Sequence, residues 1–274
     1  MNPLLTVVPM GGLCNRLRTT LSARFVSETL GRPVRVEWGR DPECGAAFDE
    51  LFLPMDGDAF RIVRRSWWNR PAVRRELYWP AMVRLFCYGE QQREYHPARH
   101  GEVKRFVRNH SRVYFSTGYA LSDYPVALTR LLCPRPEIHE RIEIVTRQFP
   151  AVTVGIHIRR TDNEKSVHGS PVSAFCRRME EEIRTNPDVR FFLATDDDAL
   201  RRDLCADYPV HLLPRQERPV RRDTLEGVRD AVADLWCLAA TRRIYGSYWS
   251  SFTDMAAEIG RVPLTIVREG NDSP

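Results

Sequence analysis

The chain has 274 residues, 43% of them hydrophobic and 28% charged, which is ordinary for a soluble globular protein of one large domain or two modest ones. Its net charge of +5 favours an anionic ligand or surface without establishing nucleic-acid binding. The seven cysteines include no CxxC pair and match no zinc site or disulfide framework, which favours a reducing compartment. No signal-peptide pattern and no apolar run of roughly 20 residues is present, so we expect a cytoplasmic protein without a transmembrane segment.

The first elements along the chain predict a parallel sheet. Residues 4–8 form an apolar run that ends in a glycine pair, and residues 15–30 then place apolar side chains at helical spacing. Residues 33–38 alternate between apolar and polar, as a strand does. Two strands around one helix form a βαβ unit, which favours parallel pairing.

The rest of the first half is less regular. We expect an amphipathic turn at residues 48–52 and a strand at residues 113–117. Between them, residues 61–84 interleave arginines with tryptophans. We favour a partly exposed helical layer in which arginine stems cover aromatic faces, because such pairs are common in ordinary folds. A lid or an acceptor-binding surface is the alternative.

The second half alternates strands with helices, which predicts an α/β fold. A proline-rich break at residues 133–136 precedes it, so we predict two domains, residues 1–140 and residues 141–274. The predicted strands span residues 152–158, 189–194, 210–213, 243–246 and 264–267. The predicted helices span residues 137–148, 172–185, 198–207, 225–240 and 253–259.

Parallel sheets bind ligands at the carboxyl ends of their strands, where four loops carry candidate residues. In the first loop, Gly11 and Gly12 stand between a strand and a helix, where backbone N–H groups can approach an anion. A tight turn explains the glycine pair equally well, and Asn15 fits a helix N-cap as well as a ligand contact.

The second loop follows a buried strand with two arginines, Arg159 and Arg160, whose guanidinium groups match phosphate or carboxylate oxygens. Asp162 is the natural partner for one of them, which leaves the other for a ligand. An ordinary surface ion-pair cluster is the alternative, and the position straight after a strand argues against it. For His157, inside the strand pattern, a structural hydrogen bond and a catalytic role stay equally open.

The third and fourth loops are acidic and hydroxyl-rich. Asp196 and Asp197 offer carboxylates for a metal, ribose hydroxyls or a base edge, although capping of the next helix by Asp196 or Thr195 explains part of the pattern. Ser250 and Ser251 precede a helix and offer a second phosphate cradle. The sequence contains no Ser-His-Asp order, HExxH or Cys/His metal spacing, so nothing in it indicates a hydrolase.

In order along the chain, these loops resemble the motifs of the fucosyltransferase superfamily. GGLCNRLR resembles the GGxxNQ-type loop of α1,2- and protein O-fucosyltransferases, and HIRRTD resembles the HxRRxD motif of α1,2- and α1,6-fucosyltransferases. FFLATDD and YGSYWSSFTDMAAEIG resemble the second and third motifs of the α1,6 branch, which includes the bacterial nodulation enzyme. The resemblance implies a GT-B fold, with two Rossmann-like lobes whose parallel sheets face a cleft. The N-terminal lobe would then serve the acceptor and the C-terminal lobe the donor.

The resemblance also implies GDP-fucose as donor, inverting transfer, and neither metal nor cofactor. Arg159 would meet the diphosphate in place of a metal ion, and Arg160 with Asp162 would be the supporting pair. The remaining donor-binding residues, with their expected places, are His157 in the strand, Asp196 and Asp197 near the nucleoside, Ser250, Ser251 and Phe252 at the phosphates and sugar, and Gly11, Gly12 and Asn15 in the other lobe.

Two residues depart from the family pattern. Arg16 stands where the N-terminal motif usually has Gln, and Val167 stands where α1,6 enzymes place a glutamate base. Glu164, an N-lobe carboxylate, or no strong base would then serve the acceptor hydroxyl, and we take Glu164 as the candidate.

We therefore expect a bacterial-type fucosyltransferase acting on a glycan, with a lipid-linked acceptor and peripheral membrane contact left open. A GT-B enzyme using a different sugar nucleotide is the first alternative. A non-enzymatic binder of nucleic acid or anionic polymer, based on residues 61–84, ranks last. The positive charge is spread and no nucleic-acid motif appears, so we expect no nucleic-acid partner.

Overall fold

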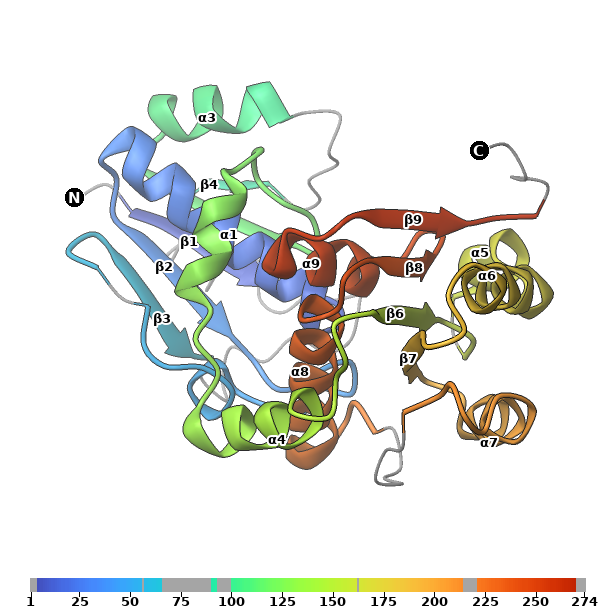
Figure 1. Cartoon of the computed structure of the whole chain (residues 1–274). Coiled ribbons are helices and arrows are strands. Elements are labelled where there is room, and N and C mark those ends of the chain that lie inside the picture. Colours follow the sequence, from blue (N-terminus) through green and yellow to red (C-terminus); the bar gives the residue numbers. More distant parts are fainter. Residues whose placement is uncertain are drawn as a thin grey trace. The chain divides into compact units, whose positions relative to one another are not determined.

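The computed structural model describes residues 4–55, 57–65, 90–92, 100–161, 163–213 and 221–269 (Figure 1). The chain divides into two compact units. Unit 1 comprises Met1–Arg135 with Arg222–Val228, and unit 2 comprises Pro136–Arg221 with Arg229–Pro274. Within the described ranges, no helix combines the length and apolarity needed to cross a membrane.

Unit 1 contains a five-stranded parallel sheet in the order β3-β2-β1-β5-β4. Its strands are β1 (Leu4–Pro9), β2 (Val34–Trp38), β3 (Phe60–Arg64), β4 (Glu90–Gln92) and β5 (Arg112–Thr117). Its helices are α1 (Leu13–Leu30) and α3 (His100–Asn109), with short 3-10 turns η1 (Phe48–Glu50) and η5 (Val126–Leu131). β1 is central, which explains why its apolar run is continuous rather than alternating.

Helix α1 is buried on several sides, and its polar residues are satisfied locally. Thr19 and Ser22 are fully buried, and their hydroxyls donate to the carbonyls of Asn15 and Thr19 at 2.9 and 2.8 Å. Ser22 Oγ also accepts from the N–H of Leu121 at 2.9 Å, which ties the segment after β5 to the helix. The helix ends at Gly31, whose φ of 58° is the left-handed conformation that glycine adopts without strain.

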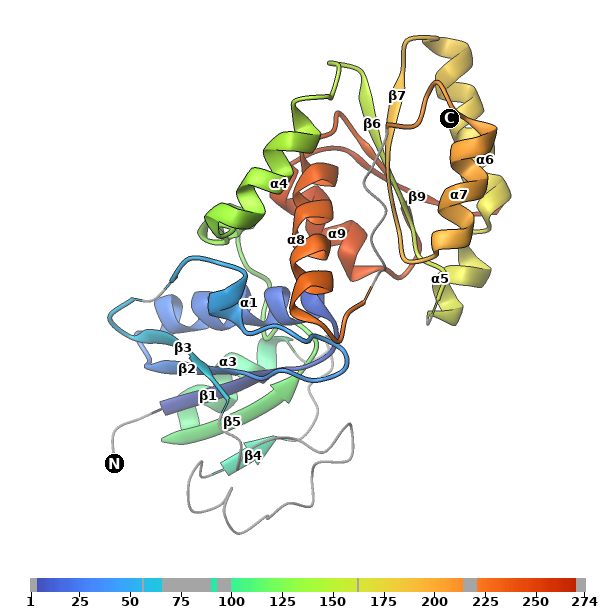
Figure 2. The ribbon, with the colours of Figure 1, turned by 90° about the horizontal axis from the view of Figure 1, so that it is seen from below.

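Unit 2 contains a four-stranded parallel sheet in the order β7-β6-β8-β9. Its strands are β6 (Thr153–Ile158), β7 (Arg190–Thr195), β8 (Ile244–Ser247) and β9 (Leu264–Val267). Its helices are α4 (Pro136–Thr146), α5 (Glu164–Gly169), α6 (Val172–Thr185), α7 (Asp198–Asp207), α8 (Leu225–Ala239, which begins in unit 1) and α9 (Ser251–Gly260). Figure 2 shows α6 and α7 on one face of this sheet and α8 and α9 on the other.

The core of unit 2 fixes the direction in which the site residues leave the sheet. Ile156 and Ile158 of β6 pack with Phe175 of α6 and Phe191 of β7, all fully buried. Burying each such side chain contributes about 1.5–3 kcal/mol. This packing holds the carboxyl end of β6 firmly, so the residues that follow Ile158 start from a rigid base.

Most predicted elements of unit 2 are confirmed, with α6, α7 and β9 at the expected bounds. The strand predicted at residues 210–213 is wrong. Only Leu212 forms a bridge, to Phe191, and Val210 is 67% exposed. The reason is that the N–H groups of His211 and Leu212 donate to the carbonyl of Tyr208, at 3.1 and 3.0 Å, which folds the start of the segment into a turn.

The irregular part of the first half also differs from expectation. The helical layer predicted from residue 61 is wrong at its start, because residues 61–64 belong to β3. Residues 66–84 of that segment lie outside the described residues. The sequence interpretation missed α3, β4 and α5, the last of which begins in the second candidate loop.

Candidate functional site

The end of β6 holds His157 in a buried, neutral state. Its ring stacks on Phe252 with the centroids 4.9 Å apart, and Nδ1 lies 2.6 Å from Thr253 Oγ1. Burial, and next the nearby charge of Arg159, lower the pKa of His157 to about 3, against the opposing effect of Asp196. The imidazole is therefore uncharged at neutral pH and joins β6 to the first turn of α9. Of the two roles left open for His157, the structural hydrogen bond accounts for these contacts.

The first of the two arginines is held by a carboxylate from the neighbouring strand. Arg159 Nη1 lies 2.8 Å from Asp196 Oδ2, and the side chains are 21% and 8% exposed respectively. Asp196 also accepts from the backbone N–H of Arg160 at 2.7 Å and from Thr161 Oγ1 at 2.6 Å. Asp196 therefore fixes both the guanidinium of Arg159 and the backbone of the loop that carries it.

Asp196 is ionised in this setting. Burial alone would raise its pKa, but the charge of Arg159 and the hydrogen bonds from Thr161 and Arg160 outweigh burial and lower the pKa below its ordinary value. The carboxylate thus keeps its negative charge at neutral pH. A charge-assisted contact of this kind positions an arginine more strictly than a neutral hydrogen bond does.

The structure shows an arginine–carboxylate pair in this loop that the sequence interpretation did not name. Asp162 was expected to hold one arginine, and it lies outside the described residues. Within the described ranges, the carboxylate that holds an arginine of this loop is Asp196, and that arginine is Arg159. The Arg160 side chain is half-buried and forms neither a hydrogen bond nor an ion pair with another described residue.

The two adjacent aspartates have different surroundings. Asp197 is the N-cap of α7, and its Oδ1 accepts from the N–H groups of Ala199 and Leu200 at 3.0 Å each. The expectation that Asp196 or Thr195 caps this helix is wrong. Thr195 Oγ1 instead accepts from the N–H of Asp197 at 3.3 Å. A cap of this type contributes about 1 kcal/mol to stability.

The beginning of α9 has open backbone donors. Its N-cap, Ser250, is buried, and its side chain forms no capping hydrogen bond. Within the described residues, no acceptor contacts the N–H groups of Ser251, Phe252 and Thr253. Open N–H groups and the positive end of a helix dipole favour an anion.

The segment between β8 and α9 is clamped to the arginine loop. Ser247 Oγ accepts from the N–H of Arg159 at 2.9 Å and lies 3.3 Å from the carbonyl of His157. Asn163 Nδ2 donates to the carbonyl of Trp249 at 2.9 Å, and Ser166 Oγ donates to that of Tyr248 at 2.7 Å. The ends of β6 and β8 and the start of α9 therefore form one connected site.

Glu164, the candidate base, begins α5 and is exposed. Its backbone carbonyl contacts His168 Nδ1 at 2.8 Å, and its carboxylate forms neither a hydrogen bond nor an ion pair with another described residue. Val167, where the family pattern has the glutamate, lies on the same short helix.

In unit 1, the glycine loop is built around Gly11. Its φ is 80°, and a Cβ there would lie 2.8 Å from Asn15 Nδ2, so a larger residue would displace Asn15. Gly12 is the N-cap of α1, which makes the N-cap alternative for Asn15 wrong. Asn15 instead lies in the first turn of the helix, next to the loop.

Arg16, the departure from the family motif, is a structural residue of this loop. It is 1% exposed, and its Nε donates to the carbonyl of Gly11 at 2.6 Å. Its Nη1 donates to the carbonyl of Gly39, and its Nη2 contacts Asp41 Oδ2, both at 2.5 Å. Arg16 thus ties the glycine loop to the segment after β2.

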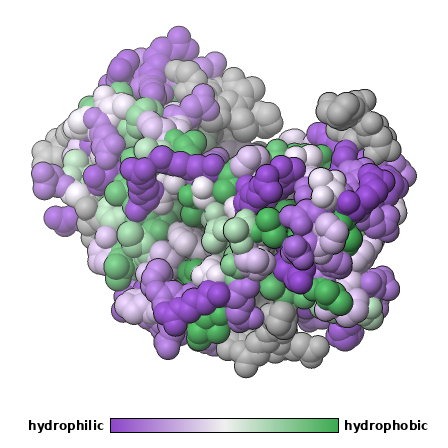
Figure 3. All heavy atoms as spheres, viewed as in Figure 1, coloured by the Kyte–Doolittle hydropathy of each residue, from purple (hydrophilic) through white to green (hydrophobic). Residues whose placement is uncertain are grey.

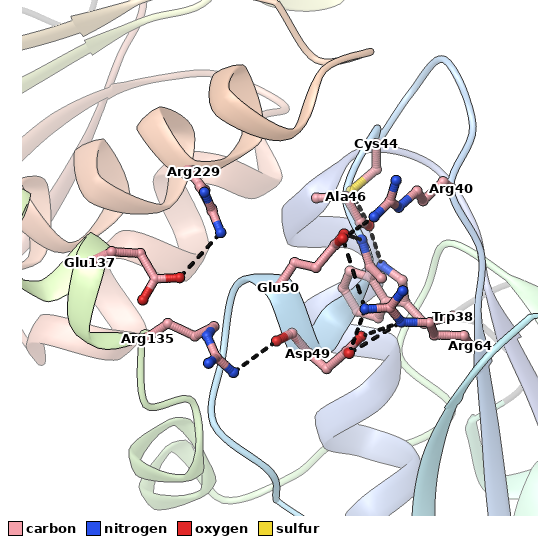
Figure 4. A network of polar contacts seen from close by, with 11 residues as sticks. Trp38, Arg40, Cys44, Ala46, Asp49, Glu50, Arg64, Arg135, Glu137 and Arg229 are labelled. Atoms are coloured by element: carbon pink, nitrogen blue, oxygen red, sulfur yellow. Dashed lines mark hydrogen bonds and ion pairs between the residues drawn. The ribbon is translucent and has the colours of Figure 1, made fainter.

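Acidic residues of unit 1 are held by arginines (Figure 4). Asp49 accepts three hydrogen bonds from Arg64, the shortest at 2.7 Å, and Glu50 pairs with Arg40. The hydrogen bond from Arg64 is the main cause that lowers the pKa of Asp49, although burial opposes it. A carboxylate with a lowered pKa is a weak base, which argues against Asp49 as the N-lobe base.

No family model matches the sequence, and no curated protein matches it. Solved structures do. A crystal structure of the NodZ α-1,6-fucosyltransferase soaked with GDP-fucose is 17% identical, with a TM-score of 0.61 over 97% of this chain and 95% of that chain. The apo form of POFUT1 is 12% identical, with a TM-score of 0.61 over 97% and 98%. Fucosyltransferase NodZ from Bradyrhizobium is 18% identical, with a TM-score of 0.57 over 93% of each chain.

The chain has the fold of these fucosyltransferases. The expected GT-B type α/β class, with two Rossmann-like lobes, is confirmed. Within the described residues, no cluster of three or more His, Cys, Asp or Glu side chains has the arrangement of a metal site.

Proposed function

We propose that the protein is an inverting fucosyltransferase that transfers fucose from GDP-fucose to a glycan acceptor. The observation that carries this proposal is the connected site at the ends of β6 and β8. There, Asp196 holds the guanidinium of Arg159, and Ser247 accepts from the backbone N–H of Arg159. The segment after Ser247 leads to the first N–H groups of α9, which have no protein acceptor among the described residues. The site lies in a fold shared with structures solved in complex with GDP and with GDP-fucose.

The chemistry of the leaving group explains why such a site suits this reaction. Glycosyl transfer passes through an oxocarbenium-like state, while the bond from the sugar carbon to the diphosphate oxygen breaks and negative charge grows on GDP. Arg159 carries a permanent positive charge and is held in place before the reaction, so it stabilises that charge without reorganising. The N–H groups of Ser251 and Phe252, with Ser250, would bind the other phosphate oxygens.

Asp196 acts, in this proposal, through Arg159. Its contacts with Arg159, Arg160 and Thr161 make it a positioning residue, and this differs from the nucleoside contact first expected for it. Asp197 keeps a proposed place near the nucleoside while it caps α7. Gly11, Gly12 and Asn15 would shape the acceptor-side loop.

Two parts of the proposal concern proton and charge balance. The acceptor hydroxyl must lose its proton as its oxygen attacks the sugar carbon, and exposed Glu164 is the proposed acceptor of that proton. We also propose that Arg159 replaces the metal ion that other transferases use, so turnover should survive a chelator. Asp162 stays a predicted member of the loop outside the described residues.

Calorimetry with GDP-fucose, GDP-mannose and UDP-glucose tests the donor. We expect GDP-fucose to bind at least tenfold more tightly than UDP-glucose. Preferred binding of UDP-glucose would favour the alternative of a different sugar nucleotide, and no binding of any of the three would refute the proposal. Release of GDP, followed with and without EDTA, tests metal independence, and a loss restored by manganese would contradict it.

A further inference from the structure

Trp249 is an exposed aromatic residue in a strained conformation. Its φ is 55°, a region that bulky side chains rarely adopt, and its side chain is 56% exposed. An exposed tryptophan gains little stability from burial, so packing at residue 249 does not offset the free-energy cost of this conformation. Strained backbone that the surroundings enforce is concentrated at functional sites.

The surroundings do enforce it. Asn163 donates to the carbonyl of Trp249 itself, and Ser166 donates to that of Tyr248. The N–H of Tyr248 in turn donates to Ser170 Oγ at 2.8 Å, and Ser170 is fully buried. Three polar side chains of the α5 segment thus hold the backbone that presents the indole.

A cation accompanies the ring. Lys165 Nζ lies 4.3 Å from the centroid of the Trp249 ring, and Lys165 is itself exposed on α5. More than half of the Trp249 side chain still faces solvent with Lys165 in this position. The pair therefore combines an exposed aromatic ring and its hydrogen-bond donor with a positive charge over one face of the ring.

The other exposed large hydrophobic residues in the described part of unit 2 lack these features. Ile144 on α4 and Val210 are 57% and 67% exposed, have ordinary backbone conformations and need no explanation. On the face shown in Figure 3, hydrophobic and hydrophilic residues are interspersed. Trp249 therefore differs from them in its positive φ, in the side-chain hydrogen bonds that hold its backbone, and in its place directly before α9.

The place in the chain indicates what would bind. Trp249 directly precedes Ser250, the N-cap of α9, and consecutive Cα atoms are about 3.8 Å apart. The backbone that presents the indole therefore leads directly into the helix end at which an anion would bind. A pyranose ring has an apolar face of C–H groups for the indole, and hydroxyl groups at its edge for Lys165.

We propose that Trp249 and Lys165 form a stacking platform for a sugar ring next to the diphosphate site. Its placement beside a diphosphate rests on the proposed function. The ring is either the sugar of the donor or the sugar of the acceptor, since both must meet at this point for transfer to occur.

The strain makes a sharp test available. Asparagine and glycine accept a positive φ more easily than tryptophan does, so Trp249→Asn and Trp249→Gly should melt at the same temperature as the wild type or higher. Trp249→Tyr keeps an aromatic face. Ile144→Asn, on α4, is the matched control for an exposed hydrophobic residue in the same unit.

Two readouts separate the sources of the sugar. In calorimetry with GDP and with GDP-fucose, a donor platform predicts that Trp249→Asn loses at least fivefold in affinity for GDP-fucose and stays within twofold for GDP. On a printed oligosaccharide array, an acceptor platform predicts at least a fivefold loss of signal with the same variant. Trp249→Tyr should recover part of whichever signal falls, and Ile144→Asn should match the wild type in both.

The outcomes distinguish this proposal from the function. If Trp249→Asn and Trp249→Gly match the wild type in both readouts, the platform is refuted while donor binding stands. If the wild type binds no GDP, the proposed function fails and the array alone decides the platform. The platform would also be refuted if the wild type binds GDP-fucose no more tightly than GDP and binds no glycan on the array.

Discussion

Two arginines follow central strands, one in each unit, and they differ in burial and in the groups that hold them. Arg16, after β1, is 1% exposed and directs its guanidinium to two backbone carbonyls and to Asp41. Arg159, after β6, is 21% exposed and is held at Nη1 by Asp196. An arginine within a motif is therefore structural when it is buried and its guanidinium donates to protein acceptors, and a ligand candidate when part of it stays exposed. The motif itself does not show which of the two applies.

The largest expected effect is on stability, from Arg16→Ala. Removing one member of a buried pair leaves Asp41 and two carbonyls without their donor, so the free energy of unfolding should fall by about 3–5 kcal/mol. Urea unfolding measures it. The control is Arg147→Ala, at an exposed residue just after α4 whose side chain pairs with Glu143, and it should change the free energy of unfolding by less than about 0.5 kcal/mol. An equal effect in the two variants would show that Arg16 is not a clamp.

Arg159→Ala should show the opposite pattern. Loss of a preorganised cation at a developing oxyanion raises the barrier by about 3 kcal/mol, which is on the order of a hundredfold in kcat. Melting temperature should fall less than in Arg16→Ala, because Asp196 keeps its hydrogen bonds from Arg160 and Thr161. GDP release under saturating donor measures the rate. Unchanged turnover in a folded Arg159→Ala protein would reject the diphosphate role.

His157 should make unit 2 sensitive to acid. Its folded pKa of about 3 lies below the unfolded value near 6.5, so the unfolded chain takes up the proton first as the pH falls. The stability difference is absent above pH 7 and grows to about 2 kcal/mol by pH 5. Urea unfolding of the wild type and of His157→Gln at both pH values tests this. Parallel pH dependence in the two proteins would contradict it.

Asp196→Asn tests whether the carboxylate positions Arg159. The amide keeps the shape and loses the charge, so kcat should fall about tenfold, or ~1.4 kcal/mol, with a smaller effect on binding of GDP. Because the pKa of Asp196 is lowered, its charge persists at neutral pH and is lost only when the pH falls below the ordinary aspartate range. A rate equal to that of the wild type would remove Asp196 from the mechanism.

The smallest effect is expected for the neighbouring aspartate. Asp197→Ala removes the cap of α7 and should lower the free energy of unfolding by about 1 kcal/mol, while Asp197→Ser restores most of it. Thermal unfolding measures both. Restored stability with a persistent loss of affinity for GDP in Asp197→Ser would support the nucleoside role that we propose beside the cap.

Local signals in the sequence were sufficient for much of the fold. Helical periodicity placed α6, and an apolar run before a glycine turn placed β1. The strand expected at residues 210–213 failed because the N–H groups of His211 and Leu212 turn back to the carbonyl of Tyr208, which is a contact outside the segment itself. Helix α5 was missed because six residues carry too little periodic signal, and Asn163 as its cap was the available sign.

The sequence by itself determined the α/β alternation, the four loops at the ends of strands, and the residue types that suit a diphosphate, because these depend on near neighbours in the chain. Only the tertiary structure decided that Asp196 holds Arg159, that His157 stacks on Phe252, and that Arg16 is buried. These pairs are 37, 95 and, for Arg16 with Asp41, 25 residues apart. Strand order and register bring such residues together, and composition and spacing do not encode that order.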